Sequence, residues 1–460
     1  MTVTELLIAV LLTGIAVSYG WGMRGAIIGG EKGAMLPGAL LGFFLAKLSG
    51  IPVVEDNAFV FAAAGCLGMG YGGFEPYAQT MEMVLHHNSD IWNPGRGYTG
   101  LMLKGANWFG ICAGVLGISF SAVTGSVYKW FEIVIVCALI PFVQALGIRI
   151  FNKPYDKDNN VFPKIYYSRN SREEWGGNFL TLMMLLAFTA IKADWFSFFF
   201  ALVGIAGGAI GWAISIWLYD VTVHPTKNGK YILGYFQKNR MVDNWKIMEF
   251  ALGFCGGVSL ALYFFLRINT VRKLALPLVT EGLWNPLGDA QEPVAWAAFA
   301  LAVLMIVQYF FKKLDGNRIM ELVERAVYFA LILCLVLLGS QQMSQLVVFL
   351  LIIWVVLEKN IFDRVDGKCV GAKFIKIFCA VVAVLALIGE LLLDNGYSMM
   401  AMLSMYTFFY IFLEALYAVT HQIHNKGENS LWSRLKGYLL TYAWFCILSV
   451  VILVTAYKLF

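Results

Sequence analysis

The sequence predicts an all-α polytopic membrane protein with about fourteen transmembrane helices, on the basis of its composition and of the length of its apolar segments. Of the 460 residues, 60% are hydrophobic and only 14% are charged. This leaves too little polar surface to cover a water-soluble globule. The hydrocarbon core offers no water to the backbone, so long unbroken apolar segments satisfy their own hydrogen bonds as helices rather than as barrel strands.

Stretches of about twenty apolar residues mark the expected helices. They cover residues 4–20, 34–50, 57–75, 101–123, 130–149, 177–192, 196–218, 247–266, 293–311, 322–340, 344–358, 372–393, 398–420 and 437–457.

Lys and Arg gather in the loops after the odd-numbered helices, which predicts that these loops face the cytoplasm across the cell inner membrane. The expected cytoplasmic side contains Lys164, Lys238 and Lys368, and the outer side contains Glu55 and Asp289. Both termini then lie outside. The net charge of +5 follows from this orientation, so the lipid bilayer is an expected partner and nucleic acid is not.

An internal match predicts a parallel duplication of four helices in the N-terminal half. Gly65, Gly68 and Gly72 match Gly204, Gly207 and Gly211 at a constant offset, and His87 and Asn107-Trp108 match His224 and Asn244-Trp245 at nearly the same offset. The predicted units are a glycine-rich repeat over 1–128, a second repeat over 129–268, and a six-helix membrane region over 269–460. Parallel repeats of this kind occur in transporters.

Two clusters near the cytoplasmic ends of the helices are candidate substrate sites. In the first, Arg24 and Glu31 lie among glycines that allow a helix to break and expose N–H groups to an anion. The alternative is a tight turn with glycine packing and a surface ion pair. In the second, Pro76 would end a helix just after Glu75 and turn the carboxylate toward the bundle interior.

The second cluster combines acidic, amide, histidine and aromatic side chains, which bind polar solutes by hydrogen bonding and stacking. The alternative is a solvated loop, with Asn107 and Asn244 as helix caps. The predicted members, with their counterparts in the second repeat, are Glu75, Tyr77, Gln79, His87, Trp92, Asn107, Trp108, His224, Asn244 and Trp245.

A third candidate is a stripe on one face of the helix expected over 398–420. Glu414, Tyr417 and His421 share that face, which predicts a proton relay. The alternative is a buried carboxyl bonded to Tyr, with His at the headgroup level. No metal-ligand spacing occurs among the five His and eight Cys, and no nucleotide-binding loop is present, so neither a metal nor another cofactor is expected.

These observations favour a secondary transporter, or permease, for a small polar solute that is anionic or sugar-like, with proton coupling through the relay. The alternative is a membrane-embedded enzyme that acts on a lipid-linked or activated substrate at the cytoplasmic face, with Glu75, His86 or His87 as general base. A channel or an envelope scaffold is a third, weaker hypothesis. The sequence is not identified as a member of any family.

Overall fold

The computed structural model describes most of the chain from residue 2 to residue 455. The described residues are 2–26, 32–73, 75–125, 127–154, 156, 159–161, 164–168, 173–225, 229–230, 243–275, 286–311, 318–357, 372–393, 399–408 and 443–455.

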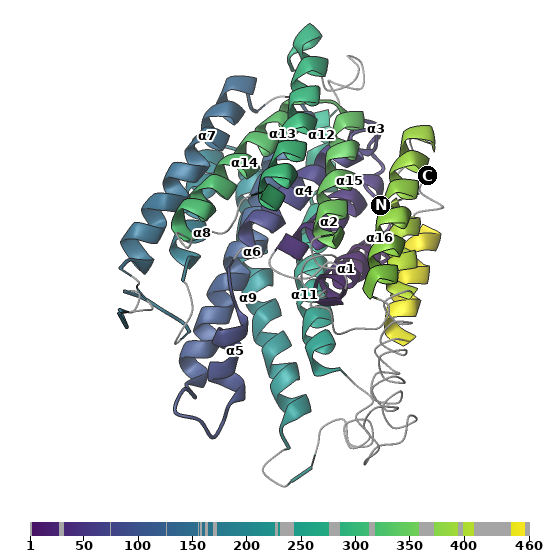
Figure 1. The fold of residues 1–460 in the computed structure, drawn as a ribbon. Helices are drawn as coiled ribbons and strands as arrows, with labels where there is room; N and C mark the ends of the chain where they lie inside the picture. The colour runs from purple at the N-terminus through teal and green to yellow at the C-terminus, as the bar shows by residue number, and fades with distance from the viewer. Residues whose placement is uncertain are drawn as a thin grey trace.

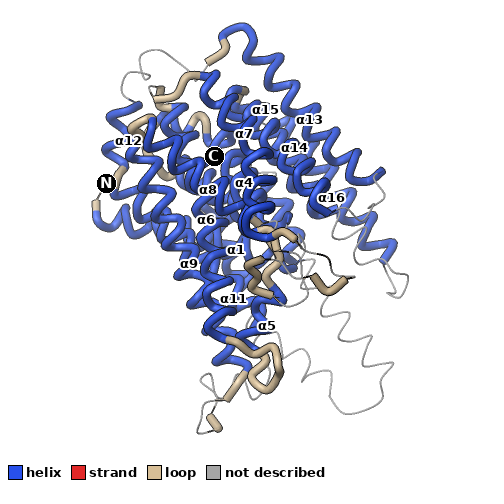
Figure 2. The backbone as a smooth tube through the Cα atoms, turned by 90° about the vertical axis from the view of Figure 1, so that its left-hand side faces the viewer, coloured by secondary structure: helices blue, strands red, loops and turns tan. Residues whose placement is uncertain are grey.

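The described part of the chain is all-α, as predicted, apart from one isolated β-bridge between Asp156 and Val161 (Figure 2). Its first half contains α1 (Val3–Ala26), η1 (Lys32–Ala34), α2 (Met35–Lys47), α3 (Pro52–Glu55), α4 (Ala58–Gly72), α5 (Ala78–Leu85), α6 (Pro94–Val123), α7 (Trp130–Gly147), the π-helical η2 (Ile148–Asn152), α8 (Trp175–Ile191) and α9 (Trp195–Val223).

The remainder contains α11 (Asn244–Leu266), α12 (Ile268–Ala275), η4 (Gly288–Ala290), α13 (Gln291–Phe311), α14 (Arg318–Leu338), α15 (Gln341–Leu357) and α16 (Ala372–Leu393), with further helical segments at Met399–Phe408 and Ala443–Thr455. A helix overlaps each of the fourteen predicted segments. Helices α1, α6 and α9 extend beyond the predicted bounds and include polar residues at their ends.

Polar side chains define where several of these helices begin. Asn93 caps α6 by accepting a hydrogen bond from the Arg96 amide, and Asp194 caps α9 in the same way through the Ser197 amide. The Asp243 carboxylate accepts two amide hydrogen bonds at the start of α11. Such caps satisfy N–H groups that the helix itself leaves unpaired.

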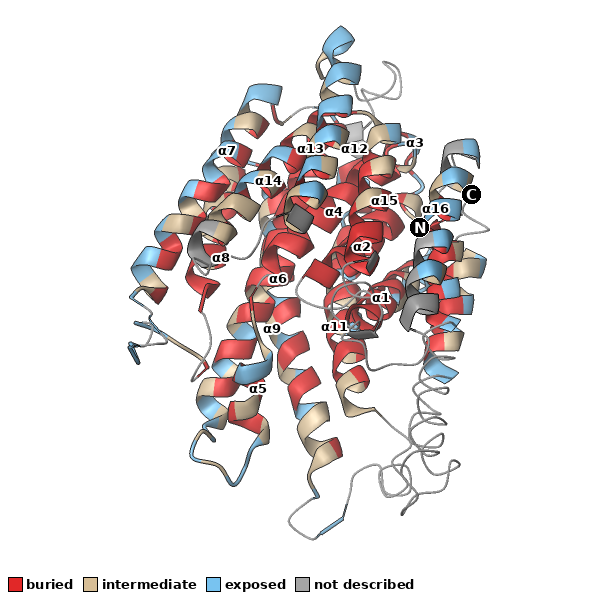
Figure 3. Cartoon of the chain, in the orientation of Figure 1, coloured by how far each residue is buried: buried red, intermediate tan, exposed pale blue. Residues whose placement is uncertain are grey.

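The burial pattern fits a bundle whose outer face meets an apolar solvent. Every residue of α4 is buried, and the red residues of Figure 3 are most continuous in α2 and α4. In contrast, Phe142 on α7 is 72% exposed and Ile191 at the end of α8 is 82% exposed. Large exposed apolar side chains over several helices are costly in water and normal in lipid.

Among the described residues, six helices are long and apolar enough to cross a membrane: Val3–Arg24, Pro94–Val123, Trp130–Asn152, Trp195–Val223, Asn244–Leu266 and Gly288–Tyr309. Together with the exposed apolar surface they indicate a multi-pass helical membrane protein. Figure 1 shows α3 and α12 at one end of the bundle and α5 at the other. We call the latter the α5 end.

Glycines allow α6 and α9, one of the most extensively packed pairs of helices, to touch backbone to backbone. A Cβ atom built on Gly208 would lie 2.1 Å from the carbonyl oxygen of Gly105, and one built on Gly105 would lie 2.3 Å from the carbonyl oxygen of Gly208. Between helices in a membrane the hydrophobic driving force is absent, so small residues at such crossings stabilise the pair through close van der Waals contact.

The substitution Gly208→Ala should therefore push α6 and α9 apart and destabilise the bundle by about 1–3 kcal/mol, the usual cost of overpacking. We expect a lower midpoint of thermal unfolding in detergent. Gly95→Ala is the control, because its added Cβ would have no neighbour closer than 3.9 Å. Equal midpoints for the two variants would contradict the role given to this contact.

Candidate functional site

Buried polar side chains gather where α6 and α8 meet the connection between α4 and α5. We call Glu75, Lys104, Asn107, Glu173 and Asn178 the polar cluster; each of them is at least 95% buried. Several buried ionisable residues in one place mark a functional site by default in a membrane protein, because each is costly to desolvate.

The amides of the polar cluster hold the backbone where α4 ends. Asn107 Nδ2 donates to Glu75 Oε1 (3.1 Å) and to the Trp175 carbonyl (3.2 Å). Asn178 Nδ2 donates to the carbonyl of Gly72, the last residue of α4 (3.1 Å). These contacts fix the Glu75 carboxyl between α6 and α8.

Lys104 supplies the positive charge of the polar cluster. Its ammonium donates to the Pro76 carbonyl and to Thr80 Oγ1 and lies 3.8 Å from Glu173 Oε2. The other oxygen of Glu173 accepts from the Tyr167 amide (2.8 Å) and from the Ser168 hydroxyl (2.7 Å). Burial, and to a lesser extent the Glu173 carboxylate, raise the pKa of the Tyr167 hydroxyl.

Beside the polar cluster lies an aromatic cluster, formed by Trp21, Tyr77, Trp108, Trp212 and Trp245. Tyr77 is at its centre, with ring-centroid distances of 5.7 Å to Trp108, 5.1 Å to Trp212 and 6.0 Å to Trp245. Trp21 stacks on Trp108 at 5.4 Å. The cluster thus draws on α1, α6, α9, α11 and the connection before α5.

Arg24, at the end of α1, adds a cation to the aromatic cluster. Its guanidinium carbon lies 5.0 Å from the ring centroid of Trp21, 4.9 Å from that of Tyr77 and 5.6 Å from that of Trp108. Its Nη1 donates to the Tyr77 hydroxyl (2.9 Å). Cation–π contacts of this kind are strongest where water is excluded.

A separate buried ion pair lies at the start of α11, next to Trp245 of the aromatic cluster. Lys246 Nζ lies 2.6 Å from Glu249 Oε2 and donates to the Gly22 carbonyl at 3.1 Å. The other Glu249 oxygen accepts from the Trp245 indole at 3.0 Å. Both carboxylate oxygens of Glu249 are therefore paired, unlike those of Glu75.

Seven buried polar atoms of the two clusters have no hydrogen bond to any residue that the structure describes. Four are acceptors and three are indole donors: Glu75 Oε2, Asn107 Oδ1, Glu173 Oε2, Asn178 Oδ1, and Nε1 of Trp21, Trp108 and Trp212. Buried polar atoms are nearly always paired, so a group of exceptions calls for a ligand or ordered water. In contrast, two small apolar cavities between α4, α6, α7, α8 and α14 offer no such polar groups.

The structure brings half of the twelve predicted substrate residues together and separates others. Arg24, Glu75, Tyr77, Asn107, Trp108 and Trp245 belong to the site just described. Gln79 is exposed on α5, and Asn244 is half-buried as the first residue of α11. His87, Trp92 and His224 form a separate group nearer the α5 end. Glu31 and the relay residues Glu414, Tyr417 and His421 lie outside the described residues.

The bases considered for an enzyme do not converge with Glu75. His86 is exposed, and its described contacts are made by its backbone. The hydrogen-bond partner of His87 Nε2 is Asp220 Oδ1 rather than Glu75.

Sequence reasoning missed several members of the site. Lys104 and Asn178 are isolated polar residues within apolar segments. A polar residue in such a segment indicates a functional position, and this was the signal that could have identified them. Trp21 and Trp212 differ in no way from packing aromatics in the sequence. Glu173 follows a basic stretch and resembles a solvated loop residue there.

Comparison of the chain with protein-family models, with curated proteins and with solved structures found no match. The fold and its apolar surface therefore define the class of protein, a multi-pass helical membrane protein, and the function has to be argued from the site itself.

Replacing Lys104 by Met should strongly destabilise the protein, because the Glu173 carboxylate would remain buried without the ammonium that faces it. Removing one partner of a buried ion pair typically costs about 3–5 kcal/mol. We expect a much lower unfolding midpoint in detergent than for Lys129→Met, which alters an exposed lysine at the start of α7. A Lys104 variant as stable as the Lys129 variant would show that the buried charges are balanced in another way.

Proposed function

We propose that this protein is a secondary transporter for a small hydroxylated solute, a sugar or sugar acid, bound between the polar and aromatic clusters. The observation that carries the proposal is the group of seven buried atoms without a hydrogen bond to a described residue, four of them acceptors and three of them donors.

The chemistry of the two clusters matches a polyhydroxylated molecule. Hydroxyl groups donate to Glu75 and to the two amide oxygens, and accept from the indole N–H groups. Aromatic faces such as that of Trp108 pack against the C–H faces of the sugar ring. Arg24 would pair with the carboxylate of a sugar acid, since a guanidinium binds carboxylates in bidentate fashion.

A transport role is supported by where the site lies among the helices. It is built where α1 and α4 end and where α11 begins, against the interior of α6. Substrate sites in transporters typically occur at such helix breaks. We further propose fourteen membrane crossings in the inner membrane, with the α5 end in the cytoplasm and coupling to protons.

Two contacts favour the duplication of 1–128 and 129–268 as part of this proposal. Two residues that are related by a two-fold axis contact each other only if both lie close to that axis. The matched pair His87 and His224 stack at 4.1 Å, and the matched Trp108 and Trp245 both contact Tyr77.

A matched pair of carboxyl variants tests the substrate site. Glu75→Gln should weaken solute binding at least tenfold with little loss of stability, because one Glu75 oxygen is free to bind ligand. Glu249→Gln should lower stability but leave affinity unchanged, because both its oxygens serve Lys246 and Trp245. Thermal shift in detergent with a panel of sugars, polyols and sugar acids provides the measurement.

If no member of that panel stabilises the wild-type protein, the proposed substrate class is wrong. If a solute binds the Glu75→Gln variant as tightly as the wild type, the site lies elsewhere.

The proposed orientation predicts opposite labelling of the two ends. Lys164→Cys should react with a membrane-impermeant maleimide only from the cytoplasmic side, and Asp289→Cys only from the outer side. The wild-type protein gives the background from its own cysteines, of which Cys255 and Cys446 are partly exposed. Labelling of both positions from the same side would contradict the orientation.

A further inference from the structure

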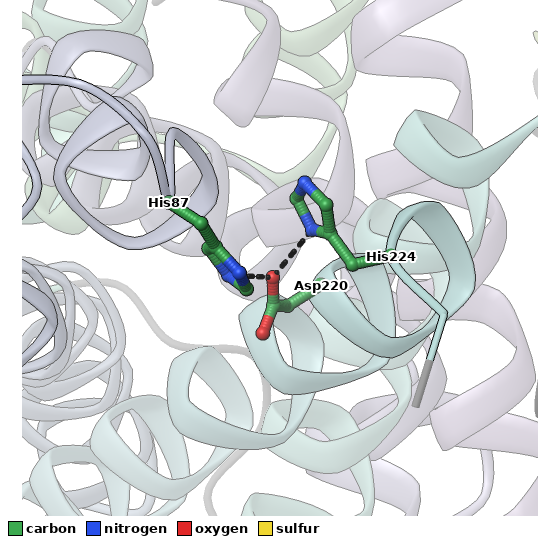
Figure 4. Close-up of side chains that lie close together, drawn as sticks. All are labelled: His87, Asp220 and His224. Atoms are coloured by element: carbon green, nitrogen blue, oxygen red, sulfur yellow. Dashed lines mark hydrogen bonds and ion pairs between the residues drawn. The ribbon is translucent and has the colours of Figure 1, made fainter. Parts of the chain in front are cut away.

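Near the α5 end, His87, Asp220 and His224 point toward one another (Figure 4). His87 Nε2 and His224 Nδ1 each lie 2.9 Å from the same oxygen of Asp220, Oδ1. The two imidazole rings are stacked with centroids 4.1 Å apart. We call these three residues the His–Asp–His cluster.

Two parts of the chain that are far apart in sequence build this cluster. Asp220 and His224 lie one turn apart at the end of α9, and this four-residue spacing places both side chains on one face. His87 comes from the connection between α5 and α6, where its ring also contacts Trp92. The cluster therefore joins the connection between α5 and α6 to α9, and it is distinct from the solute site.

The three potential ligand atoms already have nearly the spacing that a small metal ion requires. They lie within 4.8 Å of one another, whereas ligands at about 2.0–2.1 Å around tetrahedral zinc are separated by roughly 3.3–3.4 Å. Two of the three separations are 2.9 Å, so small rotations of the imidazole rings would bring all three atoms into range.

We propose that His87, Asp220 and His224 bind a divalent transition metal ion such as Zn²⁺. Two imidazoles and a carboxylate are common ligands of such ions. The side chains are 38%, 22% and 31% exposed, respectively, which gives the ion a path from solvent and allows water to complete the coordination. Neutral imidazole and carboxylate ligands leave the ion one net positive charge, which is tolerable at a partly hydrated surface.

The competing role is a hydrogen-bonded clamp without metal. A clamp needs only the contacts already present, and its strength does not depend on metal in solution. A metal site, in contrast, adds stability that grows with free metal concentration, because the ion binds the folded state.

The test is Zn²⁺ binding by isothermal titration to metal-stripped protein in detergent. A His421→Ala, His424→Ala background removes the histidines that lie outside the described residues. We expect one Zn²⁺ per chain, and at least a tenfold weaker binding in each of His87→Ala, Asp220→Asn and His224→Ala. His86→Ala is the matched control, because His86 is an adjacent exposed histidine outside the cluster.

Thermal unfolding separates binding from misfolding. Zn²⁺ should raise the midpoint of the background protein and of His86→Ala but not that of Asp220→Asn, which keeps the size and hydrogen-bonding capacity of the side chain. Absence of Zn²⁺ binding in the background protein, or unchanged binding in the three cluster variants, would overturn the proposal in favour of a hydrogen-bonded clamp.

Discussion

The backbone contact between α6 and α9 is the constraint on which the site depends. With Gly105 and Gly208 touching, Trp108 follows one turn later on α6 and Trp212 one turn later on α9, and their rings meet at 5.6 Å. Tyr77 contacts both rings. A larger residue at either glycine would separate the helices and open the aromatic cluster, so a packing requirement and a binding requirement coincide at the same crossing.

Charge balance is the second condition for burying this site. The Lys104 and Lys246 ammonium groups each lie near a carboxylate and donate to backbone carbonyls, and Arg24 is surrounded by aromatic faces. A buried charge without such partners would cost several kcal/mol. Glu75 differs, because one of its oxygens has no partner among the described residues. Among its described residues the protein thus leaves several buried acceptors, Glu75 Oε2 among them, without a hydrogen bond while it pairs the neighbouring charges, which is what pre-organisation for a ligand requires.

The fold left a stronger signal in the amino-acid sequence than the site did, so more of the fold could be predicted. Apolar length is a strong signal, so every predicted segment contains a helix. Pro76 after Glu75 and the matched Asn107-Trp108 pointed to two parts of the site because they are unusual in apolar sequence. Lys104 offered only its isolated position, and Trp212 offered nothing, since its role comes from helix packing across the bundle. Asp220 was overlooked because its metal-like spacing to His224 is completed only by a histidine from another part of the chain.

The segment from Tyr77 to His87, which contains α5, links the two sites physically. It begins with Tyr77 against Trp212 and ends with His87 against Asp220, so both of its ends contact α9. Trp212 and Asp220 are two turns apart on that helix, about 12 Å. Holding His87 at Asp220 therefore fixes the far end of a short rigid segment whose near end lies in the aromatic cluster. Any movement that withdraws Tyr77 from that cluster must therefore break the contact between His87 and Asp220 or bend α5. A metal ion bound by His87 and Asp220 would raise the free energy needed to break their contact.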